Sequence, residues 1–313
     1  MGTQVESRSE TGFRIHPDTR PGHVHLTVAD MDHQLEFYQK VIGLHLHWHE
    51  GASAGLGAGD ADVLRLTEDR NARRIRGTTG IYHFAILLPS RRELARVTAR
   101  LLAMRYLNYP TDHIMTKTTY LDDPEGNNIE IYADTPEDGT MSFTDGKAET
   151  RRADGTLSDG REPLDVDALF RELTPDDRLD QPMPAETRIG HVHLYVADLD
   201  ATLRFYHGLL GFDDMGIARD FRMGMVSAGR YHHHIGFNTW LGEGAPPAPP
   251  GSLGLRYFTF VLPSRDDLAQ VMTRVRTAGQ PVEETPKGYL VRDPAQNAIV
   301  LADRPMEETR KGR

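Results

Sequence analysis

The sequence of 313 residues contains no cysteine, which excludes disulfides and thiolate metal sites. No stretch comes near the roughly 18 consecutive apolar residues that a membrane-spanning helix needs. The first 20 residues also lack the apolar core of a signal peptide. These absences lead us to expect a cytoplasmic protein without a membrane partner.

A continuous basic surface is also missing. The net charge is −10, and the 46 acidic and 36 basic residues are spread along the chain without blocks of one sign. Binding to nucleic acid needs clustered lysine and arginine, so a nucleic-acid partner is not expected. With 38% hydrophobic residues the composition is that of a globular protein, and its length suits about two average domains. A small molecule is the expected partner.

The chain contains internal repeats, which define its organisation. The segment GHVHLTVADMDHQLEFYQKVIGL returns in the second half as GHVHLYVADLDATLRFYHGLLGF. Three pairs of similar segments follow one another in the same order: 22–44 with 190–212, 82–94 with 256–268, and 121–134 with 291–303. The chain is therefore two copies of one half, and each half contains two similar units.

Each unit begins with an alternating strand, which in the first unit places His23, His25 and Thr27 on one face. A helix follows, capped by Asp30 or the aspartate two positions later and ended by Gly43. About three short strands complete the unit. The pattern predicts an α+β protein of four βαβββ modules, which we number one to four: 20–70, 80–135, 188–242 and 254–305.

Polar, Gly-rich sequence separates the second module from the third. We expect a first half at 20–137 and a second half at 188–305, each with two βαβββ modules. The segment between them, 138–187, is predicted to be a linker with a short helix at 166–173.

The GHVHL…FY…LGF and DPEGNNIE motifs resemble those of the vicinal-oxygen-chelate superfamily, which includes glyoxalases, bleomycin-resistance proteins and extradiol dioxygenases. Four modules in one chain are most similar to the two-domain catechol 2,3-dioxygenases. The resemblance covers nearly the whole chain except the first 20 residues and the linker. It implies that modules pair edge to edge into two cupped-sheet barrels. It also implies Fe(II) bound by two histidines and a glutamate, with adjacent positions left for a catecholate and O₂.

Two of the implied ligands are in module two. His83 is in its first strand, and Glu130 alternates with two isoleucines in its last strand. Either residue alone would more simply be a core histidine or a solvent-facing carboxylate, but together in a matching motif they favour metal binding. Module four has Tyr257 and Val300 at these positions, so no metal is expected there.

The third ligand depends on which modules pair. Pairing of sequence neighbours would supply His23, whereas pairing of modules two and three would supply His191. His25 and His193 lie two residues further along the same strands and are expected to line the cup, with His193 contacting substrate. We favour His191, because only module three carries a further histidine that the family uses.

That histidine is His233, the second of three in the stretch RYHHHIGFN, and the resemblance makes it the catalytic acid and base. Strand alternation is expected to place it on the opposite face from His232 and His234, so that adjacent histidines would not converge on one ion. Family spacing adds Tyr120, ten residues before Glu130, as a second catalytic residue, and His113 as a substrate-binding one.

The sequence thus predicts an extradiol ring-cleaving dioxygenase that acts on a catechol-type aromatic diol with O₂. Its cofactor would be Fe(II), with Mn or another divalent metal as the alternative. Two other functions stay open: a glyoxalase-like isomerase or thiol transferase, and a non-catalytic protein that binds a small ligand. The presence of His83 and Glu130 argues against the last. Exposed sheet edges lead us to expect a homo-oligomer.

Overall fold

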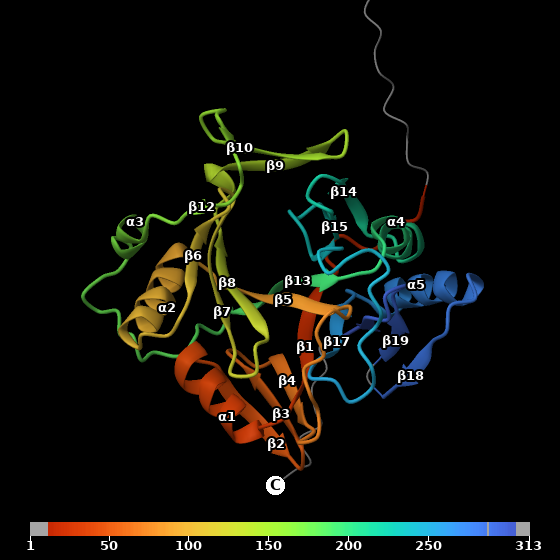
Figure 1. Ribbon diagram of the computed structural model, residues 1–313, viewed down its shortest axis with the longest axis horizontal. Coiled ribbons are helices and arrows are strands. Elements are labelled where there is room, and N and C mark those ends of the chain that lie inside the picture. The colour runs from red at the N-terminus through yellow and green to blue at the C-terminus, as the bar shows by residue number, and fades with distance from the viewer. Residues whose placement is uncertain (1–11, 287, 305–313) are drawn as a thin grey trace, which may run out of the picture.

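The structure is a computed structural model that describes residues 12–286 and 288–304 (Figure 1). Both modules of the first half have the predicted order of strand, helix and three strands. Module one consists of β1 (Arg20–Val28), α1 (Met31–Glu36), the π-helical η1 (Phe37–Ile42), β2 (His45–Glu50), β3 (Ser53–Gly57) and β4 (Asp62–Glu68). Module two consists of β5 (Gly80–Leu87), α2 (Arg91–Ala103), β6 (Tyr109–Asp112), β7 (Thr116–Asp122) and β8 (Asn128–Asp134).

The second half repeats this order. Module three consists of β13 (Arg188–Tyr195), α4 (Leu199–Leu203), the π-helical η3 (Arg204–Leu209), β14 (Asp213–Ala218), β15 (Met223–Ser227) and β16 (Ile235–Asn238). Module four consists of β17 (Gly254–Val261), α5 (Arg265–Thr277), β18 (Glu283–Thr285), β19 (Gly288–Arg292) and β20 (Ala298–Ala302). The α+β class and the four βαβββ modules are therefore confirmed.

Local signals set the helix ends. The Asp30 carboxylate accepts a hydrogen bond from the His33 backbone N–H, which makes Asp30 the N-cap of α1. Asp198 caps α4 in the same way. Gly43 ends η1 with a φ of 94°, a conformation that costs glycine little.

The modules pair across the two halves of the chain. The nine-stranded sheet has the order β12-β6-β7-β8-β5-β13-β16-β15-β14, so it joins module two to module three. The eight-stranded sheet, β18-β19-β20-β17-β1-β4-β3-β2, joins module four to module one. The contacts between modules are antiparallel, β5 with β13 and β1 with β17. This is the pairing of modules two and three that we favoured, and both sheets are open in the described part of the chain.

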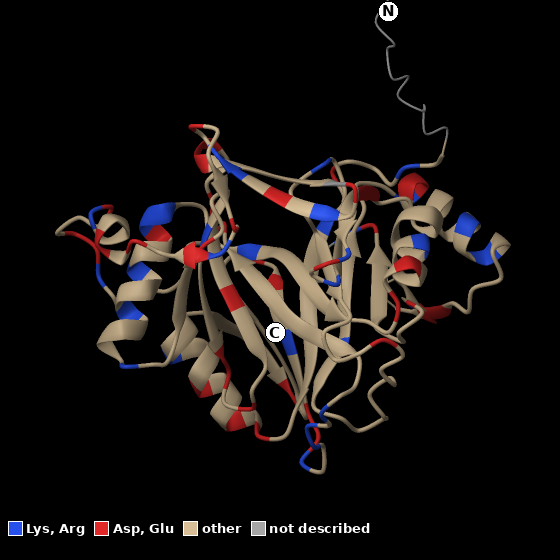
Figure 2. Cartoon of the chain, turned by 45° about the horizontal axis from the view of Figure 1, so that its top comes forward, with Lys and Arg blue, Asp and Glu red and all other residues tan. Residues whose placement is uncertain are grey.

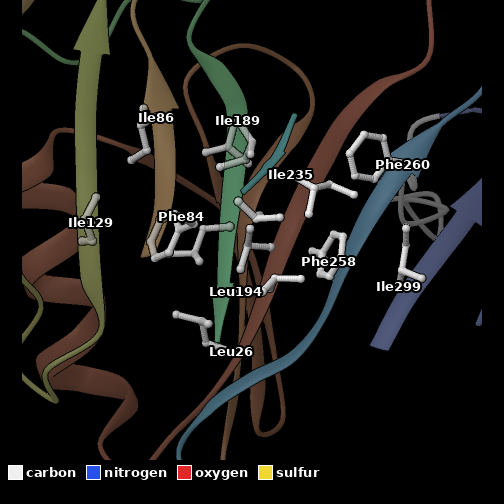
Figure 3. Close-up of a cluster of buried hydrophobic side chains, with 14 of the residues drawn as sticks. Leu26, Phe84, Ile86, Ile129, Ile189, Leu194, Ile235, Phe258, Phe260 and Ile299 are labelled. Atoms are coloured by element: carbon white, nitrogen blue, oxygen red, sulfur yellow. The ribbon is translucent and has the colours of Figure 1, made fainter. Parts of the chain in front are cut away.

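The core lies between the two sheets, where their apolar faces pack together (Figure 3). Phe84 and Ile129 from the nine-stranded sheet and Leu26 and Phe258 from the eight-stranded sheet are at most 1% exposed. Because neighbouring residues in a strand point to opposite faces, the residues between them point away from this core. We call that outer face of the nine-stranded sheet the cup face.

The residues between the two halves, predicted to be a linker, form short strands and a helix of their own. After η2 (Pro136–Asp138), which ends the first half, they form β9 (Gly139–Thr144), β10 (Lys147–Arg152), β11 (Leu157–Ser158), β12 (Glu162–Pro163) and α3 (Val166–Phe170). The β9–β10 hairpin reaches from module two to module three, where the Arg219 backbone N–H donates to the Gly146 carbonyl at 2.7 Å (Figure 1). β12 joins the nine-stranded sheet beside β6.

Figure 2 shows Lys and Arg positions interspersed with Asp and Glu positions along helices, loops and strands. Within the described residues, no helix has the length and apolar character needed to cross a bilayer.

A repeated buried contact joins the two modules of each half, which lie in different sheets in the described part of the chain. The Tyr38 hydroxyl of module one donates to the Asp123 carboxylate of module two at 3.0 Å, and Tyr206 donates to Asp293 at 3.1 Å. All four groups are buried, and an asparagine four residues later also donates to each aspartate.

We predict that Tyr38→Phe and Tyr206→Phe each lower the free energy of unfolding by about 1–3 kcal/mol, because each leaves a buried carboxylate with one donor fewer. Urea denaturation measures this. The exposed Tyr109→Phe is the control and should be neutral. Equal stability of all three variants would show that these hydroxyls do not hold the two modules of each half together.

Candidate metal centre

Strand alternation places three candidate ligands on the cup face of neighbouring strands. Glu130 on β8 lies between two core isoleucines and opposite Ala85 of β5. A bulge at Gly190 lets β13 present Ile189 to the core and His191 to the cup face. His83 on β5 reaches the same spot, so three strands from two modules meet there.

The three donor atoms form a nearly regular triangle. His83 Nε2 lies 3.2 Å from Glu130 Oε2, His191 Nε2 lies 3.1 Å from the same oxygen, and the two Nε2 atoms are 3.4 Å apart. Donors about 2.1 Å from one ion would lie about 3.0 Å apart in octahedral and about 3.4 Å apart in tetrahedral geometry. The triangle therefore fits a divalent metal ion, and the donor set of two imidazoles and one carboxylate suits iron, manganese or zinc.

Burial and hydrogen bonding at this group also fit a metal. The three residues are only 3–4% exposed, and neither His83 nor His191 has a hydrogen bond to its Nδ1 among the described residues. Burial alone would raise the pKa of Glu130, but His191 and His83 together hold that pKa well below its usual range. Burial lowers the pKa of His191. An anionic carboxylate and neutral imidazoles are the forms that bind a cation.

His232, His233 and His234 do not alternate between the two faces of a strand as expected. β16 begins only at Ile235, so they belong to a loop and strand alternation does not apply to them. The rings of His233 and His232 lie 4.1 and 6.0 Å from that of His191, whereas His234 bonds to Ser227 and the Ala228 backbone. The prediction that adjacent histidines cannot converge is wrong: His191, His232 and His233 also offer donors within 4.8 Å of one another.

The imidazole of His233 lies at the cup face, packed against His191. Its Nδ1 is buried and makes no hydrogen bond to the described residues. Burial, followed by the neighbouring His191, lowers the pKa of His233 well below its usual range. A neutral imidazole beside the triangle is able to accept a proton.

Tyr120 and His113 form a chain beside the triangle. The ring centroids of Tyr120 and His83 lie 5.6 Å apart, and His113 Nδ1 is 2.6 Å from the Gly160 carbonyl. A carbonyl only accepts, so in neutral His113 the proton is on Nδ1, and Nε2 accepts from the Tyr120 hydroxyl at 2.9 Å. Burial, then the charge of Glu130, raises the pKa of Tyr120 well above its usual value, so it stays a neutral phenol.

An aromatic wall next to the triangle contains His193, which was predicted to line the cup, together with Tyr82 and Trp240, which were not predicted. His193 packs 5.1 Å from His83, and Tyr82 lies 5.2 Å from His193 and 5.1 Å from Trp240 between ring centroids. His83 points to the cup face, so simple strand alternation would point its neighbour Tyr82 to the opposite face. The register shift between β5 and β13 at this residue, a β-bulge, brings it to that face, and periodicity alone carries no signal for it.

Among the residues that the structure describes, the eight-stranded sheet holds no equivalent group of metal-binding side chains. In its register Tyr257 takes the position of His83, and Val300 that of Glu130. His23 packs edge-on against Tyr257 at 5.7 Å, in the other sheet from His83. Among the described residues, the groups able to hold a metal all contain His191. The structure therefore brings His191, and not His23, to His83 and Glu130.

Close packing explains why a glycine precedes both His191 and His23. A Cβ at Gly190 would overlap the hydroxyl of Tyr132, whose ring lies 5.1 Å from that of His191. A Cβ at Gly22 would overlap Thr259 in the same way.

We predict that Gly190→Ala displaces Tyr132 and shifts His191. It should lower stability by about 1–3 kcal/mol and weaken binding of a divalent metal. Urea denaturation and metal titration by calorimetry measure the two effects. Gly208→Ala is the control, because nothing lies within 4 Å of a Cβ there. Unchanged metal affinity in Gly190→Ala would contradict the role given to this glycine.

Comparison with known proteins agrees with the fold and the repeats. The model of the "Glyoxalase/Bleomycin resistance protein/Dioxygenase superfamily" matches residues 20–131 and 188–301. A Bacillus subtilis (strain 168) protein named catechol-2,3-dioxygenase is 38% identical over 289 residues, which cover 91% of this chain and 98% of that protein.

Solved structures show the same fold at low sequence identity. A putative dioxygenase from Bacillus subtilis has a TM-score of 0.60 at 15% identity, covering 94% of this chain and 87% of that one. Glyoxalase I from Zea mays has a TM-score of 0.54 at 17% identity, covering 91% and 92%. The family model and the extended sequence identity together show that this chain belongs to the glyoxalase/bleomycin-resistance/dioxygenase superfamily.

Proposed function

We propose that the protein is an Fe(II)-dependent extradiol dioxygenase that opens the ring of a catechol-type diol. The observation that carries the proposal is the buried triangle of His83, Glu130 and His191, with His233 on one side and Tyr120 on the other. The relative named catechol-2,3-dioxygenase supports it. A protein that only sequesters a ligand would not need two imidazoles and a carboxylate buried together.

In this proposal the triangle holds the metal on one side only. His83, His191 and Glu130 would be its protein ligands, and the carboxylate would offset one of its two positive charges. When bound, Fe(II) would supply a Lewis acid that lowers the pKa of the diol and a place where diol and O₂ lie side by side. The reaction balances without another reductant: one ring carbon–carbon bond breaks, and both atoms of O₂ enter the product.

The chain's own residues would then move protons and orient the ring. His233 would accept a proton from the diol at its free ring nitrogen and return one to the ring-opened product. The Tyr120 hydroxyl, which hydrogen-bonds to His113 and to Glu130, would orient a substrate oxygen beside the triangle. His193, held by the side chain of Asn238 at 3.0 Å, and the aromatic wall would contact the substrate ring.

Anaerobic reconstitution with Fe(II), followed by catechol and air, tests the proposal. We expect a yellow ring-opened product and uptake of one O₂ per catechol. Parallel samples with Mn(II) and Zn(II) identify the active metal. Glu130→Gln should lose both metal and activity, whereas the exposed Glu137→Gln should keep them. No O₂ uptake with several substituted catechols, together with turnover of a methylglyoxal–thiol adduct, would contradict the proposal.

A further inference from the structure

The segment between the two halves contributes an arginine to the cup face. Gly160 accepts the hydrogen bond of His113, and Glu162 lies in register with Asp112 of β6. Arg161, between them, is therefore held beside the His113–Tyr120 chain, although it lies about 80 residues after His83 in the sequence. Figure 1 shows β12 next to β6 at this end of the sheet.

The side chain of Arg161 extends toward the aromatic wall. Its guanidinium lies close enough to Tyr82 and Tyr120 for its positive charge to act on both hydroxyls. The carboxyl side chain of its neighbour Glu162 is directed instead to Arg152 and Ser158. Arg161 thus lies where Tyr82 borders the candidate metal centre.

This guanidinium has unused binding capacity. Arg161 is exposed and takes part in no ion pair with the described residues. The carboxylates whose charges reach Tyr82 are Glu130, which belongs to the metal triangle, and Asp122, which accepts from the Asn128 side chain at 2.8 Å. A guanidinium has five N–H donors in a planar fork, which matches the two oxygens of a carboxylate.

We propose that Arg161 binds a carboxylate substituent on the substrate ring, so that the preferred substrates are catechols that carry a carboxylate. The inference rests on the proposed function and names its substrate class. With the diol at the triangle and the ring against Tyr82, a substituent at the far side of the ring lies within reach of the guanidinium. A neutral catechol offers the guanidinium no anionic group, so Arg161 stays beside Tyr82 and adds nothing to the binding of that substrate.

The test compares kcat/KM for 3,4-dihydroxybenzoate and 3,4-dihydroxyphenylacetate with that for catechol and 4-methylcatechol. We expect the wild type to prefer the carboxylated pair. Arg161→Gln should lose about 10- to 100-fold on that pair, as for a lost charged hydrogen bond, and stay within about threefold on the neutral pair. Arg161→Lys should lose less, because the charge remains while the fork is lost.

Arg171→Gln is the matched control, an exposed arginine of the same segment that lies at the end of α3. It should behave as wild type on all four substrates. An equal effect of Arg161→Gln on carboxylated and neutral catechols, or none on either, would overturn the inference while ring cleavage itself stands.

Failure of the proposed function would look different. If no catechol is cleaved, anaerobic calorimetry with 3,4-dihydroxybenzoate and the metal-loaded protein still decides the role of Arg161. Binding that is at least tenfold weaker in Arg161→Gln supports it, and equal or absent binding in both proteins refutes it.

Discussion

Replacement of His191 by alanine is expected to abolish binding of Fe(II) and ring cleavage. Its Nε2 is one corner of the triangle, 3.1 Å from Glu130 and 3.4 Å from His83. Loss of residues that only support a metal ligand costs about 10- to 100-fold in affinity or activity, so loss of a ligand should cost more than about 100-fold. Iron content after anaerobic loading and calorimetric titration with Mn(II) measure the effect independently of activity.

His23→Ala is the control for this experiment. His23 has the same place in the repeat and is equally buried, at 3% exposure, but it lies in the other sheet beside Tyr257. Its replacement can lower stability, yet the protein that stays folded should load one equivalent of metal and cleave substrate normally. Full metal occupancy in His191→Ala, or its loss in folded His23→Ala, would show that the metal is held elsewhere.

His233→Ala is expected to keep the metal and lose the chemistry. The His233 ring packs 4.1 Å from that of His191 but lies outside the triangle of closest donors. General acid–base groups contribute about 10²- to 10⁴-fold, so kcat should fall by that factor with full iron occupancy. Steady-state O₂ uptake and iron content, measured on the same samples, separate the two effects.

The neighbouring His234→Ala provides the comparison. Its side chain bonds to Ser227 and the Ala228 backbone and is directed away from the triangle, so kcat should stay within about threefold of wild type. Because His232 and His233 can both approach His191, loss of iron in His233→Ala would indicate that this histidine is a ligand and not a proton carrier.

The order of elements and the candidate ligands were predictable because both are local. Strand alternation placed Glu130 on the face opposite two buried isoleucines, and an N-cap aspartate marked the start of the first helix. The repeats then supplied equivalent positions in the other modules. Tyr257 and Val300 explain why, in the described part of the chain, the candidate metal group lies in the nine-stranded sheet and not in the other.

Other parts of the site depend on departures from regular geometry, which periodicity does not record. The bulge at Tyr82 turns its ring to the cup face, and the loop before β16 brings His232 and His233 together at His191. Arg161 comes from a segment that read only as a polar linker, and it reaches the site because β12 adds to the edge of the sheet.

By itself, then, the sequence determined the four modules and the residues that each could offer, since turns, caps and alternation act over a few neighbouring positions. Only the tertiary structure decided between His191 and His23. Four similar modules have similar first strands, so the choice between β13 and β1 as the partner of β5 depends on how whole sheets pack and on where the chain between them can pass. That choice unites His191 with His83, although 108 positions of sequence separate them.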